Sequence, residues 1–256
     1  MQFASLGSGS KGNATLVESG KTCILIDCGF STKEIEKRIQ QHGKQADDIH
    51  SILVTHEHAD HIGGVARLSR KYRIPVLMTS GTWNQCRLRH DIPDLHLISS
   101  HESFHLDDLE INPFPVPHDA REPVQFVFSD GQFRLGLLTD TGSITPHIQD
   151  MLTRVDALIL EGNYDHKMLM NGEYPAQLKQ RVSSRTGHLS NEQAADLLDS
   201  LDCSGLQHIV AAHMSEKNNH PSLVSASFSA ALGCHDDWII QAEQSSGTEW
   251  LSLNSQ

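Results

Sequence analysis

The chain alternates short apolar runs with turn residues, a pattern that predicts buried strands. Residues 15–29 predict two strands joined by a Ser-Gly turn, and residues 49–55 and 74–79 predict one strand each. In the second half, residues 109–116, 155–163 and 206–215 each predict a strand. We also expect a hairpin over 124–140 around Asp130-Gly131, and a final pair of strands from residues 237–244 and 248–254.

Three stretches have the apolar spacing of amphipathic helices instead. Residues 31–43 predict a helix that Ser31 caps, that Glu34 completes as a capping box and that Gly43 ends. The pattern over 62–72 is also helical. A third helix is expected over 191–201, where Ser190 and Gln193 form a capping box. Because no repeat, low-complexity tract or linker interrupts the chain, residues 1–256 are expected to form a single domain.

Polar, ligand-type side chains recur where the apolar strands end. Strand ends on one side of a packed sheet can converge, and functional sites favour such edges. Six residues share this position: Asp27, His56, His118, Asp140, Glu161 and His213.

The stretch "LVTHEHADHIGG" has the densest cluster of such residues. His56 and His58 are two positions apart, so in an extended segment they point the same way and can reach one metal ion. If a helix begins near Asp60, then Asp60 and His61 turn toward a neighbouring position, which gives two adjacent metal sites. Imidazole and carboxylate ligands favour zinc, manganese or iron over calcium. The alternative for the stretch alone is a solvated polar loop.

Composition narrows the possible functions. A formal net charge of -12 makes the chain a poor non-specific nucleic-acid binder, so a phosphate substrate needs a local positive site. No apolar run reaches the length of a membrane span, and the N-terminus lacks the pattern of a signal peptide. Five cysteines without a CxxC pair fit a reducing compartment. We therefore expect a cytoplasmic protein without a membrane partner; the oligomeric state stays open.

In their order and their completeness, these residues resemble the sequence motifs of the metallo-β-lactamase superfamily. Asp27 matches its first motif, the cluster from His56 to His61 its second, His118 its third, Asp140 its fourth and His213 its fifth. Within the superfamily, the stretches "SLGSGSKGN", "ILIDCG", "THEHADHIGG", "LTDTG", "GHLSNEQAA" and "HMSEKNN" are most similar to the YycJ-type (WalJ-type) bacterial hydrolases. That group stands near the tRNase Z and phosphodiesterase branch and is linked to 5′-to-3′ DNA exonuclease activity.

The resemblance implies an α+β fold, the four-layer αββα sandwich, with two divalent metal ions at one rim of the sheets. Zinc or manganese is expected, with iron less favoured. The implied ligands of the first ion are His56, His58 and His118, and those of the second are Asp60, His61 and His213. Asp140 would bridge the two ions, and Asp27 would support the site from behind the ligands.

Two residues are expected to act in catalysis. Asp60 would orient the nucleophile or move protons, besides binding metal. His188 precedes a helix N-terminus, where an anion is favoured, and the phosphodiesterase branch keeps a similar histidine near the scissile phosphate. For His188 the alternative is an ordinary surface loop.

The expected activity is metal-dependent hydrolysis of a phosphodiester, with nucleic acid as substrate and DNA favoured. The nucleophile would be a hydroxide that bridges the two ions, which lower the pKa of bound water and stabilise charge on the phosphate. A thioester or lactone hydrolase with the same metal core is an alternative. An alternative of another class is a non-catalytic relative that only binds nucleic acid, although such relatives typically lose ligands.

Other polar stretches are less specific. The loop "GSGSKGN" lacks the spacing of a nucleotide-binding loop, and its glycines Gly7 and Gly9 either let the backbone pass close to the metal rim or form a plain turn. The basic stretches "RLSRKYR" (67–73) and "RLRH" (87–90) are either solvated faces or contacts to phosphates.

Overall fold

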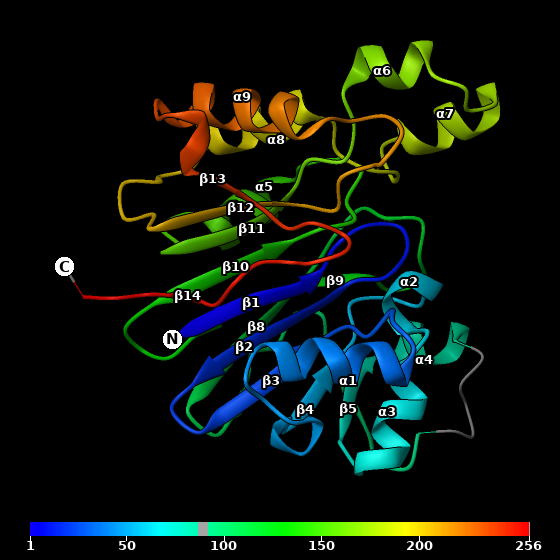
Figure 1. Ribbon diagram of the computed structural model, residues 1–256, viewed down its shortest axis with the longest axis vertical. Coiled ribbons are helices and arrows are strands. Elements are labelled where there is room, and N and C mark those ends of the chain that lie inside the picture. Colours follow the sequence, from blue (N-terminus) through cyan, green and yellow to red (C-terminus); the bar gives the residue numbers. More distant parts are fainter. Residues whose placement is uncertain (87–91, 256) are drawn as a thin grey trace.

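The computed structural model describes residues 1–86 and 92–255, so the basic stretch 87–90 lies outside the described residues. Within these residues the chain forms two seven-stranded sheets that face each other, with helices on their outer sides (Figure 1). The order in the first sheet is β14-β1-β2-β3-β4-β5-β6, and in the second β13-β12-β11-β10-β9-β8-β7.

Each sheet combines an antiparallel part with a parallel part. In the first sheet the strands from β3 to β6 are parallel, and in the second those from β10 to β13. The strands of the first sheet are β1 (Gln2–Gly7), β2 (Ala14–Ser19), β3 (Thr22–Ile26), β4 (Ser51–Leu53), β5 (Val76–Thr79), β6 (Leu95–Ile98) and β14 (Leu251–Ser252). Those of the second are β7 (Phe104–Leu106), β8 (Leu109–Pro115), β9 (Val124–Ser129), β10 (Arg134–Leu138), β11 (Ala157–Glu161), β12 (His208–Ala212) and β13 (Ile239–Gln241).

The helices lie in two outer groups. Those of the first half are α1 (Thr32–Gln41), the short 3₁₀ helix η1 (Ala46–Asp48), α2 (Ala59–Ile62), α3 (Val65–Tyr72) and α4 (Ser80–Gln85). Those of the second half are α5 (Pro146–Leu152), α6 (His166–Asn171), α7 (Ala176–Val182), α8 (Asn191–Ser200), α9 (Pro221–Leu232) and η2 (Asp236–Trp238). Figure 1 shows α1 and α3 outside the first sheet, and α8 and α9 outside the second.

Alternation along the strands explains the four layers. In β3, Ile24 and Ile26 point into the core between the two sheets, whereas Cys23 and Leu25 point toward α1 and α3. Because side chains of a strand alternate between faces, a continuous apolar run is buried on both sides. A third cluster joins the outer face of the second sheet to α5, α8 and α9. The predicted αββα sandwich is thus confirmed.

Both predicted final strands form, but they do not pair with each other. Residues 239–241 form β13, which joins β12 in the second sheet, whereas residues 251–252 form β14, which joins β1 in the first. The physical reason is that α9 returns the chain as a crossover, so β13 extends the parallel series. The chain then crosses to the other sheet, where β14 pairs with the edge of β1. Sequence patterns also missed β1, β6, β7, α4 to α7 and α9.

Of the two predicted capping boxes, one forms and the other is wrong. The Ser31 hydroxyl accepts from the Glu34 amide at the start of α1, but the Glu34 carboxylate pairs with Arg38 at 2.7 Å instead of completing a box. The box of Ser190 and Gln193 at α8 forms in full.

Among the described residues, no helix combines the length and apolarity needed to cross a membrane.

Candidate metal centre and active site

The candidate residues gather at one rim because parallel strands end there. Asp27 directly follows β3, Asp140 closely follows β10, and His213 directly follows β12. All three have left-handed backbones, with φ of 60°, 50° and 51°. Aspartate and histidine occur in this region more often than most residues, and such conformations concentrate at functional sites. The sharp turn after each strand places its side chain at the rim.

A first group of donors comprises His56, His58 and His118, and its donor atoms all lie within 4.8 Å of one another. The Nε2 atom of His118 lies 3.2 Å from Nδ1 of His58. His118 Nδ1 donates to the Gly187 carbonyl over 3.0 Å, which leaves its Nε2 lone pair facing the group.

His56 is oriented by a relay through Thr55. The Thr55 hydroxyl donates to Asp27 Oδ2 over 2.8 Å, so its oxygen can accept from His56 Nδ1, which lies at 2.9 Å. The lone pair of His56 is then on Nε2. This atom is buried and has no hydrogen-bond partner among the described residues.

A second group comprises Asp60, His61 and His213. As expected, a helix (α2) begins just before Asp60 and turns Asp60 and His61 away from the first group. Asp60 Oδ2 lies 3.6 Å from Nε2 of both His61 and His213. Asp140 Oδ2 lies 3.1 Å from His61 Nε2, and His56, His61 and Asp140 also form a close set, so Asp140 stands between the two groups.

The donor set fits divalent metal ions. Six buried side-chain atoms lack a hydrogen bond within the described residues, although burial without a partner is costly, and three of them belong to candidate ligands: His56 Nε2, Asp140 Oδ2 and His213 Nε2. All three face the candidate groups. Two imidazole nitrogens that share one tetrahedral zinc lie about 3.4 Å apart, close to the separation of His58 and His118. Metal ions bound to these groups would give the three atoms partners without any rearrangement of the fold.

The electrostatics differ between the two groups. Burial lowers the pKa of His56 well below its usual value and lowers that of His118. Burial also opposes the charge on His213, but the carboxylates of Asp140, Asp60 and Glu161 outweigh it and raise its pKa to about 10. The pKa of His61 is likewise raised, against burial, by Asp140 and Asp27. The second group therefore holds more negative charge than the first.

His188 and Glu161 form a pair beside these groups. His188 Nδ1 lies 2.7 Å from Glu161 Oε1, and the other Glu161 oxygen accepts from the amides of Leu189 and Thr141. Glu161 is fully buried. Burial opposes the charge on His188, but Glu161 outweighs it and raises the His188 pKa. His188 lines the cavity and, with Nδ1 engaged, has Nε2 available for a ligand.

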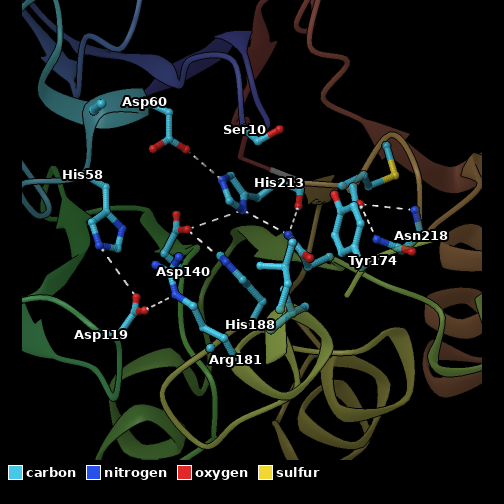
Figure 2. Close-up of a pocket in the computed structure, with 17 residues that line it drawn as sticks. Ser10, His58, Asp60, Asp119, Asp140, Tyr174, Arg181, His188, His213 and Asn218 are labelled. Carbon is cyan, nitrogen blue, oxygen red and sulfur yellow. Dashed lines mark hydrogen bonds and ion pairs between the residues drawn. The ribbon is translucent and has the colours of Figure 1, made fainter. Parts of the chain in front are cut away.

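These residues surround a cavity of about 350 Å³. Figure 2 shows Asp60, Asp140, His188 and His213 around its centre. Tyr174 and Asn218 lie on one side of His213, whereas Asp119, His58 and Arg181 lie on the other. The cavity therefore offers candidate metal ligands, a histidine with a raised pKa, an aromatic ring and an arginine within one space.

Sequence reasoning missed several residues of this site. Asp119 lies 3.7 Å from His58 Nε2 and pairs with Arg181 at 2.7 Å. Its position directly after His118 was the one available signal. Tyr174 and Arg181 had none, because they belong to the short helical segment between Glu161 and His188. Glu161 was recognised as a strand-end residue but given no role.

The N-terminal loop runs along the metal rim. Its Ser8 hydroxyl accepts from the His213 amide over 2.9 Å, and Asn13 Nδ2 lies 3.1 Å from His61 Nε2. Gly9 has a φ of 140°, and a Cβ there would lie 2.8 Å from Gln244 Oε1. The loop thus passes close to the rim, but the close neighbour of Gly9 is Gln244 and not a candidate ligand, so the expectation that the glycines permit this passage stays a prediction. The basic stretch 67–73 belongs mainly to α3, and none of its residues lines the cavity.

Comparison with known families matches residues 22–214 to the Beta-lactamase superfamily domain. Exodeoxyribonuclease YycJ of Bacillus anthracis is 36% identical over 235 residues, covering 91% of this chain and 89% of that protein. Exodeoxyribonuclease WalJ of Streptococcus pneumoniae serotype 2 is 32% identical over 249 residues, covering 93% of each chain.

The fold likeness extends to solved structures. The metallo-β-lactamase fold protein YhfI from Bacillus subtilis superposes with a TM-score of 0.76 at 13% identity, over 96% of this chain and 98% of that one. At this identity the likeness shows the fold alone. The family assignment rests on the domain match and on the two relatives that align over most of their length. The chain therefore belongs to the metallo-β-lactamase superfamily.

Proposed function

We propose that this protein is a dinuclear, metal-dependent phosphodiesterase, an exonuclease that acts on nucleic acid and most readily on DNA. The observation that carries the proposal is the His188–Glu161 pair, in which a buried carboxylate contacts the His188 imidazole and raises its pKa beside two groups of metal donors. A positive donor suits the oxygens of a phosphodiester. The names of the two full-length relatives support DNA as the substrate.

We assign the metal ligands by their two groups. His56, His58 and His118 would hold the first ion, and Asp60, His61 and His213 the second. Asp140 would contact both ions, because it stands between the groups. Asp27 would bind neither ion and would orient His61. Zinc or manganese suits this set of imidazoles and carboxylates.

The protein's own residues have separate tasks in hydrolysis. When bound, two divalent ions supply a nucleophile near neutral pH and stabilise charge on the phosphate. Asp60, which is partly exposed to the cavity, would bind the second ion through Oδ2 and orient the attacking group through its other carboxylate oxygen. His188 would donate from Nε2 to the leaving oxygen, while Glu161 stabilises the imidazolium at Nδ1.

We further propose that residues 1–256 act as one domain. The core between the sheets includes Phe3 from one end of the chain and Leu253 from the other. A shared core of this kind supports cooperative folding of the whole chain.

A parallel assay tests the proposed activity. Purified protein loaded with zinc or manganese is given labelled single-stranded DNA, RNA, bis(p-nitrophenyl) phosphate and a glutathione thioester. We expect cleavage of DNA from an end and no thioester hydrolysis. Thioester cleavage with intact phosphodiesters would instead favour the rival hydrolase, and nucleic-acid binding without any cleavage would favour the non-catalytic alternative.

A further inference from the structure

The segment between Glu161 and His188 forms one wall of the cavity. It carries α6 and α7, which Figure 1 shows beyond the end of the second sheet. From this segment Tyr174, Leu178, Arg181 and Val182 line the cavity. Its ends are fixed, because the Asp165 amide donates to the Asn218 carbonyl and the His188 amide donates to the Val182 carbonyl. The wall is thus tied to the loop that carries His188.

Arg181 is the one lysine or arginine among the cavity-lining residues, all of which lie in the described part of the chain. Its side chain is 63% exposed, and its Nε atom donates to Asp119 Oδ2 over 2.7 Å. That contact orients the guanidinium while its terminal nitrogens make no hydrogen bond to a described residue. A guanidinium held in this way can form paired hydrogen bonds with a phosphate. In a chain of net charge -12, such a cation at the cavity is a specific feature.

Tyr174 contributes an aromatic ring to the opposite side. Figure 2 shows Tyr174 beside Asn218, with His188 and His213 between it and the side of Asp119. Leu178 and Met214 add apolar surface to the cavity lining. No described residue forms a hydrogen bond with the Tyr174 hydroxyl, so the ring is not fixed by a polar contact. A partly exposed ring near apolar side chains can stack on a nucleobase of any type.

We propose that Tyr174 and Arg181 form a subsite for the terminal nucleotide of a single strand. The terminal base stacks on Tyr174, the scissile phosphate lies over the candidate metal ligands, and the next phosphate contacts Arg181. A volume of about 350 Å³ is at the small end of ligand pockets, which suits one nucleotide rather than a duplex. This subsite rests on the proposed function, and it explains why cleavage would begin at the end of a strand.

The test is a cycle of protein and substrate changes. Wild-type protein and Tyr174→Ala are each tested on single strands with ordinary bases at both ends and on strands with an abasic terminal nucleotide. The abasic nucleotide is placed at the 5′ end in one strand and at the 3′ end in another. We expect Tyr174→Ala to lower kcat/KM about tenfold on the ordinary strand, as for a lost base stack. On the strand that is abasic at the attacked end, the substitution should change little, because the base is already missing.

Matched variants separate stacking from structure. Tyr174→Phe keeps the ring and should stay near wild type, as should Gln177→Ala, which changes an exposed α7 residue outside the cavity lining. Arg181→Gln should reduce the salt dependence of log KM by about 0.7, the value for one single-strand phosphate contact. Arg181→Lys should restore part of it, and metal content should be unchanged throughout.

Two results separate the Tyr174 subsite from the proposed phosphodiesterase activity. If Tyr174→Ala lowers activity equally on ordinary and abasic strands at both ends, or does not lower it at all, the subsite is wrong while phosphodiesterase activity stands. If the metal-loaded wild type cleaves no phosphodiester, the proposed function fails and the subsite fails with it.

Discussion

Asp27 and His61 are joined by a hydrogen bond in which His61 Nδ1 donates to Asp27 Oδ2 over 2.8 Å. The same carboxylate accepts from the amide and the hydroxyl of Thr55, whose oxygen accepts in turn from His56. One buried carboxylate thus orients a histidine in each candidate metal group. Such contacts behind the ligands fix the tautomer and raise the basicity of the ligating nitrogen.

Replacing Asp27 should therefore weaken metal binding without removing a ligand. Asp27→Asn is the best variant, because asparagine tolerates the left-handed backbone that Asp27 adopts. We expect metal affinity to fall about 10-fold to 100-fold, measured by competition with a chelator. Affinity equal to that of wild type would show that the Asp27–His61 contact does not contribute to metal binding.

His188→Ala should separate catalysis from metal binding. We expect kcat to fall about 10²-fold to 10⁴-fold with little change in KM or in metal content, as for a lost proton donor. His213→Ala is the control and should lose both metal and activity. If His188→Ala loses metal while His213→Ala keeps it, the two residues exchange roles.

Proton release on metal binding should distinguish the two groups. In the metal-free protein the carboxylates around His213 raise its pKa to about 10, so it holds an extra proton at pH 8, and the raised pKa of His61 makes its proton harder to remove as well. An ion bound there must displace these protons, so its affinity weakens as pH falls. His56 and His118 have lowered pKa values and are already neutral. Calorimetry in buffers of different ionisation enthalpy should show proton release for one ion of the two; equal release for both would contradict the assignment.

Gly187 should be intolerant of any side chain. A Cβ there would lie 2.2 Å from the Val182 carbonyl oxygen, and the Gly187 carbonyl orients His118. Gly187→Ala must shift the loop that carries His188, and displacement of a catalytic group by about 1 Å can cost 10²-fold in rate. Gly205→Ala is the control, because the nearest atom to its Cβ would be 4.0 Å away. Equal steady-state rates for both variants would exclude this role of the loop.

The strand-end residues were predictable from the sequence for a physical reason. Each follows an apolar run, and parallel strands that end at one edge bring such residues together. His188 could be proposed as a catalytic residue because the capping box of Ser190 and Gln193 predicts the start of a helix beside it. The ligand assignment itself came from resemblance, and it stays a proposal.

The cavity wall was not predictable in the same way. Helices α6 and α7 are six and seven residues long and expose most of their side chains, so they lack a recognisable apolar period. The Asp119–Arg181 pair joins residues 62 positions apart, and local patterns carry no signal for such a contact. The pairing of the final strands was mispredicted for a related reason, because partners far along the chain decide which sheet each strand joins.

The most direct test of the central claim is metal content and single-strand DNA hydrolysis measured on the same purified sample, with zinc or manganese added back stepwise to metal-free protein. We predict that cleavage from a DNA end appears as the metal content approaches two ions per chain and disappears on chelation. Full activity with one ion per chain, or no phosphodiester cleavage at two, would contradict a dinuclear phosphodiesterase.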